Sequence, residues 1–296
     1  MDGPHGLGLT TRAFGLKGAH GWAFHEVSFD AEPGSLIAVE GPSGSGRTCL
    51  LLALTGRMKA TDGSATVGGW NLPRHSAAVR RVSALAHVSG VTDLDPALTV
   101  GEHLRERALL ERRFGGSPRE LLRPRAERAA ETRARVDAAL TTAGLDRESL
   151  PKGDRTAVRD LERLEALRLS VALALIGEPR LLGVDDADLK LSDSERAEVW
   201  ALLRSLSEAG TTVVAVCSEA PEGAFTVSTA AAPAPPRERK QDGAEPDGEA
   251  PDGEAPDGEA PEATSPDVTV PDLTVPDLTE THEKETVDAF PETGRA

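Results

Sequence analysis

Hydrophobic and polar positions form a repeating order along the chain, from about residue 21 to residue 218. Short apolar runs of strand length alternate with segments that have helical periodicity. The pattern predicts strands at residues 35–40, 64–67, 82–88, 180–184 and 212–216. It predicts helices at residues 48–54, 99–144, 160–176 and 194–208, the second of them broken near residues 115–118 and 124. This alternation predicts an α/β fold with a mixed, mostly parallel sheet.

The order ends near residue 230, and five-residue repeats follow from residue 243. GAEPD, GEAPD, GEAPD and GEAPE are followed by PDVTV, PDLTV and PDLTE. This period is too short for a solenoid, and the repeats are rich in proline and acid with few large apolar side chains. We therefore expect an N-terminal segment at residues 1–20, a folded domain at 21–230 and a disordered acidic tail at 231–296. The tail is expected to be a spacer, and a short docking motif in the PDVTV-type repeats is the alternative.

The net charge of −16 lies mostly in the tail. Residues 231–296 carry 18 Asp and Glu against 5 Lys and Arg, a net of −13, which leaves −3 for residues 1–230. The acidity therefore says little about what the folded domain binds. The segment at 101–135 is rich in arginine but nearly free of aromatic side chains. We expect a solvated helical surface there rather than a platform for single-stranded nucleic acid.

The chain shows no signal for zinc, secretion or membrane insertion. Its two cysteines, Cys49 and Cys217, lie far apart and lack the spacing of a zinc site or a disulfide framework. The N-terminus lacks the pattern of a signal peptide, and no apolar run approaches the ~18 residues of a membrane helix. We therefore expect a cytoplasmic chain whose membrane role, if it has one, comes through a partner.

A glycine-rich loop follows the strand expected at residues 35–40 and leads into a helix. Its sequence GPSGSGRT fits the phosphate-loop layout GxxxxG-K-[ST] except for Arg47. Glycines let backbone N–H groups turn inward, and the helix N-terminus favours an anion. Thr48 supplies a hydroxyl for Mg²⁺, while Arg47 keeps the positive charge on a longer, planar group. The expected phosphate-binding residues are Gly41, Ser43, Gly44, Ser45, Gly46, Arg47 and Thr48.

From about residue 21 to residue 218 the chain resembles the nucleotide-binding subunit of an ATP-binding cassette (ABC) transporter. The resemblance rests on four segments in order: the stretch from VSFDAEPG through the phosphate loop to TVGG, then LTVGEHL, ALIGEPRLLGVDDAD and GTTVVAV. It implies a P-loop NTPase fold of ABC type, with a helical subdomain inserted at about residues 99–176. It also implies Mg-ATP as the ligand.

The resemblance places the catalytic positions on particular residues. Asp185 matches the Walker B aspartate, which with Thr48 would hold Mg²⁺. Asp186 stands at the catalytic glutamate position and is one methylene shorter, which puts its reach to the attacking water in doubt. His87 aligns with the glutamine that helps to ligate magnesium and senses the membrane partner. Trp22 or Phe24 is the candidate to stack on adenine, and either could instead pack in the core.

Other family positions are substituted. LERLE at residues 161–165 replaces the signature LSGGQ, so two carboxylates stand where serine and glycines would face a phosphate. The simpler interpretation of this stretch is a packed helix. Ser218 stands in place of the switch histidine, and Ser192 replaces the D-loop aspartate. These departures weaken hydrolysis more than binding, because backbone amides bind phosphate regardless of them.

Three functions follow from the resemblance. In the first, the chain would be an ATP-binding subunit with weak hydrolysis that works with a membrane-spanning permease, as a homodimer or with a second cassette. Alternatively, it is a non-hydrolysing structural or regulatory cassette paired with a competent ATPase. A soluble cassette acting on nucleic acid is the least favoured, and we expect no nucleic-acid partner. The expected location is the inner face of the cell membrane, through the permease.

Overall fold

The computed structural model describes residues 6–19, 21–114 and 124–229. The acidic tail expected at residues 231–296 lies outside these residues, as does the helix break expected at residues 115–118. The described residues all belong to one compact unit of the chain. Their element order is an alternation of strands and helices, which confirms the predicted α/β class.

A five-stranded sheet forms the centre of this unit, and all its neighbouring strands pair in parallel. Its strands, in spatial order, are β6 (Ser83–Ala86), β7 (Leu181–Val184), β8 (Thr212–Val216), β3 (Leu36–Glu40) and β9 (Phe225–Ser228). Four of them lie where the apolar runs predicted strands. The fifth strand, β9, was not predicted, and its pattern of mostly exposed side chains is typical of a sheet edge.

A second sheet is antiparallel, so the mixed sheet of the prediction is divided into two. Its order is β2 (Gly21–Ala31), β1 (Leu9–Gly18), β4 (Asp62–Val67) and β5 (Trp70–Leu72). The N-terminal segment that was set apart at residues 1–20 thus contributes β1, which pairs with both β2 and β4. The expected boundary at residue 21 falls at the β1–β2 turn.

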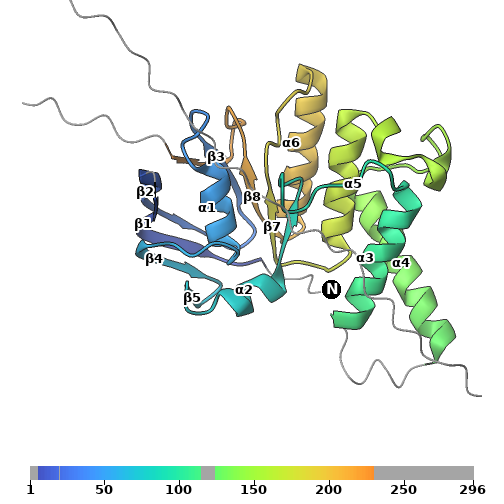
Figure 1. Cartoon of the computed structure of the whole chain (residues 1–296), viewed down its shortest axis with the longest axis horizontal. Helices are drawn as coiled ribbons and strands as arrows, with labels where there is room; N and C mark the ends of the chain where they lie inside the picture. Colours follow the sequence, from blue (N-terminus) through green and yellow to red (C-terminus); the bar gives the residue numbers. More distant parts are fainter. Residues whose placement is uncertain (1–5, 20, 115–123, 230–296) are drawn as a thin grey trace, which may run out of the picture. The chain divides into compact units, whose positions relative to one another are not determined.

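The parallel sheet separates two apolar clusters, because successive side chains of a strand point to opposite faces. In β3, Ile37 and Val39 join the cluster that contains the antiparallel sheet and α1 (Arg47–Leu54). Leu36 and Ala38 join the cluster that contains the helices of the other face. These helices include α6 (Asp193–Glu208) and α5 (Arg163–Leu175). Figure 1 shows α1 beside β3, and α5 and α6 on the other side of β7 and β8.

The helical part expected at residues 99–176 consists of α3 (Val100–Phe114), α4 (Arg125–Ala143) and α5, which contact one another. Thr99 and Glu102 begin α3 with the expected cap, since the Glu102 carboxylate accepts a hydrogen bond from the Thr99 amide at 2.8 Å. The short helices η2 (Gly153–Arg155) and η3 (Val158–Asp160) precede α5. The helix α5 therefore begins three residues later than the sequence pattern indicated. The remaining helix, α2 (Ser76–Val82), leads into β6.

Candidate nucleotide-binding site

The glycine loop joins the carboxyl end of β3 to the N-terminus of α1. Its glycines have positive φ angles, with Gly44 at 81° and Gly46, the N-cap of α1, at 80°. No side chain caps α1, so its first-turn N–H groups are left to other acceptors. Free amides at a helix N-terminus attract an anion such as phosphate. The loop therefore has the local structure that the sequence analysis expected.

Thr48 and Asp185 lie side by side, although 137 positions separate them in the sequence. The Thr48 hydroxyl donates to the Asp185 carboxylate, with Oγ1 at 3.2 Å from Oδ1 and 2.9 Å from Oδ2. Burial is the largest cause that raises the pKa of Asp185. Hydroxyl and carboxylate oxygens suit Mg²⁺, which keeps several waters and takes its other ligands from substrate phosphates. The pair therefore fits the metal site assigned to it.

Arg47 does not point back along its own loop. Its Nη1 donates to the carbonyl oxygen of Cys217, the residue that follows β8. The guanidinium thus joins the first turn of α1 to the segment that contains Ser218. A lysine at this position would have a single ammonium and a shorter reach.

Asp186 and His87 stand at the ends of neighbouring strands, β7 and β6. The Asp185 amide donates to the Ala86 carbonyl at 3.3 Å. This hydrogen bond joins the two strand ends directly before Asp186 and His87. Both have left-handed backbones, with φ of 46° for Asp186 and 58° for His87. Such non-glycine conformations are costly and cluster at functional sites.

The environment of His87 favours a neutral ring. Its pKa is lowered mainly by burial and then by the charge of Arg163, while Asp186 and Asp93 act in the opposite direction. The hydroxyl of Ser170, in α5, accepts a hydrogen bond from the His87 amide at 2.7 Å. The position is therefore connected both to the carboxyl end of β7 and to helix α5.

The stretch LERLE, which was expected at the signature position, forms the N-terminus of α5. Glu162 is the N-cap, and its backbone N–H donates to the Glu165 carboxylate at 2.9 Å as part of a capping box. This agrees with the interpretation of LERLE as the start of a packed helix. The first turn of α5 thus already carries an acceptor of its own, whereas the first turn of α1 has none.

Ser192 and Ser218 also have structural partners. Ser192 caps α6, and Glu195 completes its capping box. The backbone N–H of Ser218 donates to Asp188 at 2.8 Å.

The structure separates the two candidate aromatic residues. Phe24 is almost fully buried and lies 5.7 Å from the ring of Phe14, centroid to centroid. Trp22 is 45% exposed, and Lys17 Nζ lies 5.5 Å from its ring centroid. Of the two, only Trp22 presents a ring that a ligand can reach.

Sequence reasoning missed three residues around this site. Asp188, only 8% exposed, and Glu40 accept hydrogen bonds from the segment after β8. Thr229, at the end of β9, lies 2.6 Å from the Ser45 hydroxyl. Asp188 could have been noticed as an acid beside the DD pair, but nothing in the sequence indicates that residues 45 and 229 meet.

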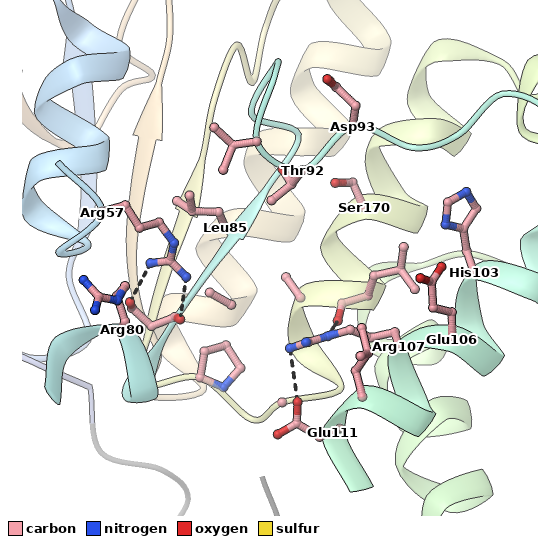
Figure 2. Close-up of a pocket in the computed structure, with 18 of the residues that line it drawn as sticks. Arg57, Arg80, Leu85, Thr92, Asp93, His103, Glu106, Arg107, Glu111 and Ser170 are labelled. Atoms are coloured by element: carbon pink, nitrogen blue, oxygen red, sulfur yellow. Dashed lines mark hydrogen bonds and ion pairs between the residues drawn. The ribbon is translucent and has the colours of Figure 1, made fainter. Parts of the chain in front are cut away.

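A separate groove of about 870 Å³ shares none of its lining residues with the glycine loop. Figure 2 shows arginines entering it from two sides: Arg57 and Arg80 from one, and Arg107 of α3 from the other. Arg57 donates to Ser83, and its pKa is lowered to about 10 by burial and by the charges of Arg80 and Arg107. Residues 91–94, a few positions after His87, also line the groove.

Three comparisons relate the chain to known proteins. The family model described as "ABC transporter" matches residues 24–188. The ABC transporter G family member 21 of Arabidopsis thaliana is 34% identical over 188 residues, which are 64% of this chain and 26% of the relative. Nod factor export ATP-binding protein I of Cupriavidus metallidurans is 29% identical over 191 residues, 64% of this chain and 55% of the relative. The chain therefore spans about half the length of the second relative and about a quarter of the first.

Solved structures share the fold at low sequence identity. cbiO1 of Clostridium perfringens, part of the ABC transporter complex cbiONQ, superposes with a TM-score of 0.56 at 18% identity, over 71% of this chain and 78% of that one. A dimeric ATP-binding cassette bound to ADP and Pi has a TM-score of 0.55 at 21% identity, over 71% and 88%. The family model covers more than half of the residues, and the chain therefore belongs to the ABC transporter family.

Proposed function

We propose that this chain is an ATP-binding subunit that holds Mg-ATP on residues 41–48 and Asp185. The observation that carries the proposal is the contact of Thr48 with Asp185 at the uncapped N-terminus of α1. It brings a magnesium-type oxygen pair to the same point as free backbone amides. The relative from Cupriavidus metallidurans is named an ATP-binding protein, which supports the same ligand.

Each residue of the proposed site would have a distinct role. The amides of the loop and Arg47 would bind phosphate oxygens. Thr48 and Asp185 would hold Mg²⁺, which supplies charge neutralisation at the phosphates when bound. Trp22 would stack on the base, and His87 would lie at the magnesium end of the site. The ring of His87, kept neutral by its surroundings, can accept a hydrogen bond there.

We further propose that the chain works with a membrane-spanning permease and a second cassette, on the cytoplasmic face of the membrane. The arginine-lined groove supports the contact with the permease, because its wall continues into the segment after His87. A permease that binds in this groove would contact residues 91–94, which are only a few positions from His87 in the sequence. Among the described helices, none combines the length and the apolar composition needed to cross a bilayer.

Hydrolysis is proposed to be weak. Asp186 has a shorter side chain than the glutamate of the family, and Ser218 lacks a ring that could contact the nucleotide. A non-hydrolysing cassette paired with a competent ATPase is the second candidate. The observation that favours it is the capped N-terminus of α5, because Glu165 accepts the Glu162 N–H that starts this helix. Two carboxylates there would repel the phosphate of an opposing nucleotide.

Equilibrium binding of a fluorescent Mg-ATP analogue tests the first proposal. The wild-type chain should bind the analogue, and Thr48→Ala should weaken binding more when Mg²⁺ is present than when it is chelated. Thr66→Ala is a matched control, since Thr66 lies on β4 and bonds Asn71 instead. Absence of binding by the wild type at millimolar nucleotide would reduce the proposal to a similarity of fold.

Steady-state turnover separates the two candidates. For weak hydrolysis, the wild type should show slow phosphate release that Asp186→Glu increases, because the longer carboxylate recovers reach. For the non-hydrolysing cassette, neither protein releases phosphate alone, although both bind nucleotide. Robust turnover by the wild type would contradict both forms of the proposal.

A further inference from the structure

Arg47 connects two segments that the family's sequence pattern treats separately. It is the first residue of α1, at the phosphate-loop position normally held by lysine. Its Nη1 donates to the Cys217 carbonyl, 2.5 Å away, directly before the position of the missing switch histidine. One end of this contact is thus the substituted phosphate-loop residue, and the other end lies one residue before Ser218.

The segment after β8 offers its N–H groups to carboxylates. Asp188 accepts from Ser218 at 2.8 Å and from Glu219 at 3.3 Å. Glu40 accepts from Ala220 at 3.3 Å. Both acceptors are anionic, so they would repel a phosphate. Arg47 is the cationic contact that the described residues provide between this segment and the glycine loop.

The chemistry of arginine allows two simultaneous contacts. A guanidinium has five N–H donors in a rigid plane, and only Nη1 is used on Cys217. The Nε and Nη2 groups can donate to phosphate oxygens, which match the planar fork. Lysine has one compact ammonium and cannot span a carbonyl and a phosphate in the same way.

We infer that Arg47 is a positioning residue that links the bound phosphates to the segment of residues 217–220 through the Cys217 carbonyl. One side chain here takes the place of two, the phosphate-loop lysine and the switch histidine. The inference rests on the proposed binding of Mg-ATP and adds how the chain registers the nucleotide. Under this inference the substitutions at positions 47 and 218 are coupled, because Arg47 takes over the roles of both family residues.

Hydrogen–deuterium exchange of the full chain tests the link, first without nucleotide. Arg47→Lys should speed exchange in residues 217–220 by about tenfold, the effect of losing one charge-assisted hydrogen bond. Arg80→Lys is the matched control, because Arg80 donates to the Gly56 carbonyl at 2.8 Å and should leave residues 217–220 unchanged. Equal exchange in wild type and Arg47→Lys would overturn the inference.

The same measurement with a Mg-ATP analogue tests the coupling. In the wild type, nucleotide should slow exchange in residues 217–220. Arg47→Lys should still bind the analogue, within about tenfold in affinity, but its nucleotide should no longer protect this segment. Protection equal to that of the wild type would overturn the inference. No binding by any variant would instead contradict the proposed function, so the two failures are distinguishable.

A double-mutant cycle completes the test. Ser218→His in the Arg47→Lys background should restore nucleotide-dependent protection, because it rebuilds the lysine–histidine arrangement. The same substitution in the wild-type background should add little. If the effects of the two substitutions on nucleotide-dependent protection simply add, the two residues act independently and the inference is overturned.

Discussion

The Glu165 carboxylate accepts a hydrogen bond from the backbone amide of Glu162 at 2.9 Å and so closes the N-terminus of α5. The contact lies in the stretch LERLE, which the resemblance to the family predicts at the signature position. In this chain the corresponding turn is satisfied from within.

Glu165→Ala should lower the free energy of unfolding by about 1 kcal/mol, because it removes the capping carboxylate. Urea denaturation measures this change. Glu208 is the exposed last residue of α6, and Glu208→Ala should change the free energy of unfolding by less than about 0.5 kcal/mol. A loss no larger for Glu165→Ala than for Glu208→Ala would show that the cap contributes nothing measurable.

Gly44→Ala and Gly46→Ala should differ in cost although both glycines have positive φ. A Cβ on Gly44 meets nothing within 4 Å, so only the backbone strain of roughly 1–2 kcal/mol applies. A Cβ on Gly46 would lie 2.0 Å from the Ala23 carbonyl oxygen, and β2 would have to move. Thermal unfolding should therefore show the larger drop for Gly46→Ala, and equal drops would contradict the close approach of β2. A substitution at Gly46 is thus a poor test of nucleotide binding by itself.

Asp185→Asn should make the nucleotide-free chain more stable at pH 7. Burial raises the pKa of Asp185 in the folded state, so the unfolded state ionises first as pH rises. The free energy of unfolding therefore falls as pH rises from the unfolded pKa to the folded pKa of Asp185. The chain remains less stable by this amount at neutral pH. Urea unfolding at pH 7 checks the gain, and Mg-dependent nucleotide binding should disappear in the same protein. A less stable Asp185→Asn would show that its bond with Thr48 outweighs the burial of the charge.

His87→Gln should reduce the loss of stability on mild acidification. The pKa of His87 is lowered in the folded state, so the unfolded state binds more protons just below its ordinary value of about 6.5. Stability therefore falls as pH drops through this value and toward the folded pKa. Urea unfolding at pH 7.5 and 5.5 measures the fall in each protein. An identical fall in both would show that His87 contributes nothing to it.

Much of the parallel sheet was predictable from local pattern. The run at residues 212–216 is buried at every position and apolar from Val213 onward, because a central parallel strand is covered on both faces. The edge strand β9 was not predictable in this way, because an edge strand with mostly exposed side chains has no continuous apolar run. The division into two sheets was not predictable from local pattern either, because β1 pairs with β4, more than 40 positions away in the sequence.

The sequence by itself determined the glycine loop and the family, because motif order and backbone chemistry are written in consecutive residues, and it predicted Thr48 and Asp185 as the metal-binding pair. Only the tertiary structure decided what Arg47 and Asp188 contact. Hydrogen-bond partners such as the Cys217 carbonyl come from segments 170 positions away, brought together by strand order. The arginine at residue 47 and the serine at residue 218 are visible in the sequence, whereas the contact of Arg47 with the Cys217 carbonyl, next to Ser218, exists only in the folded chain.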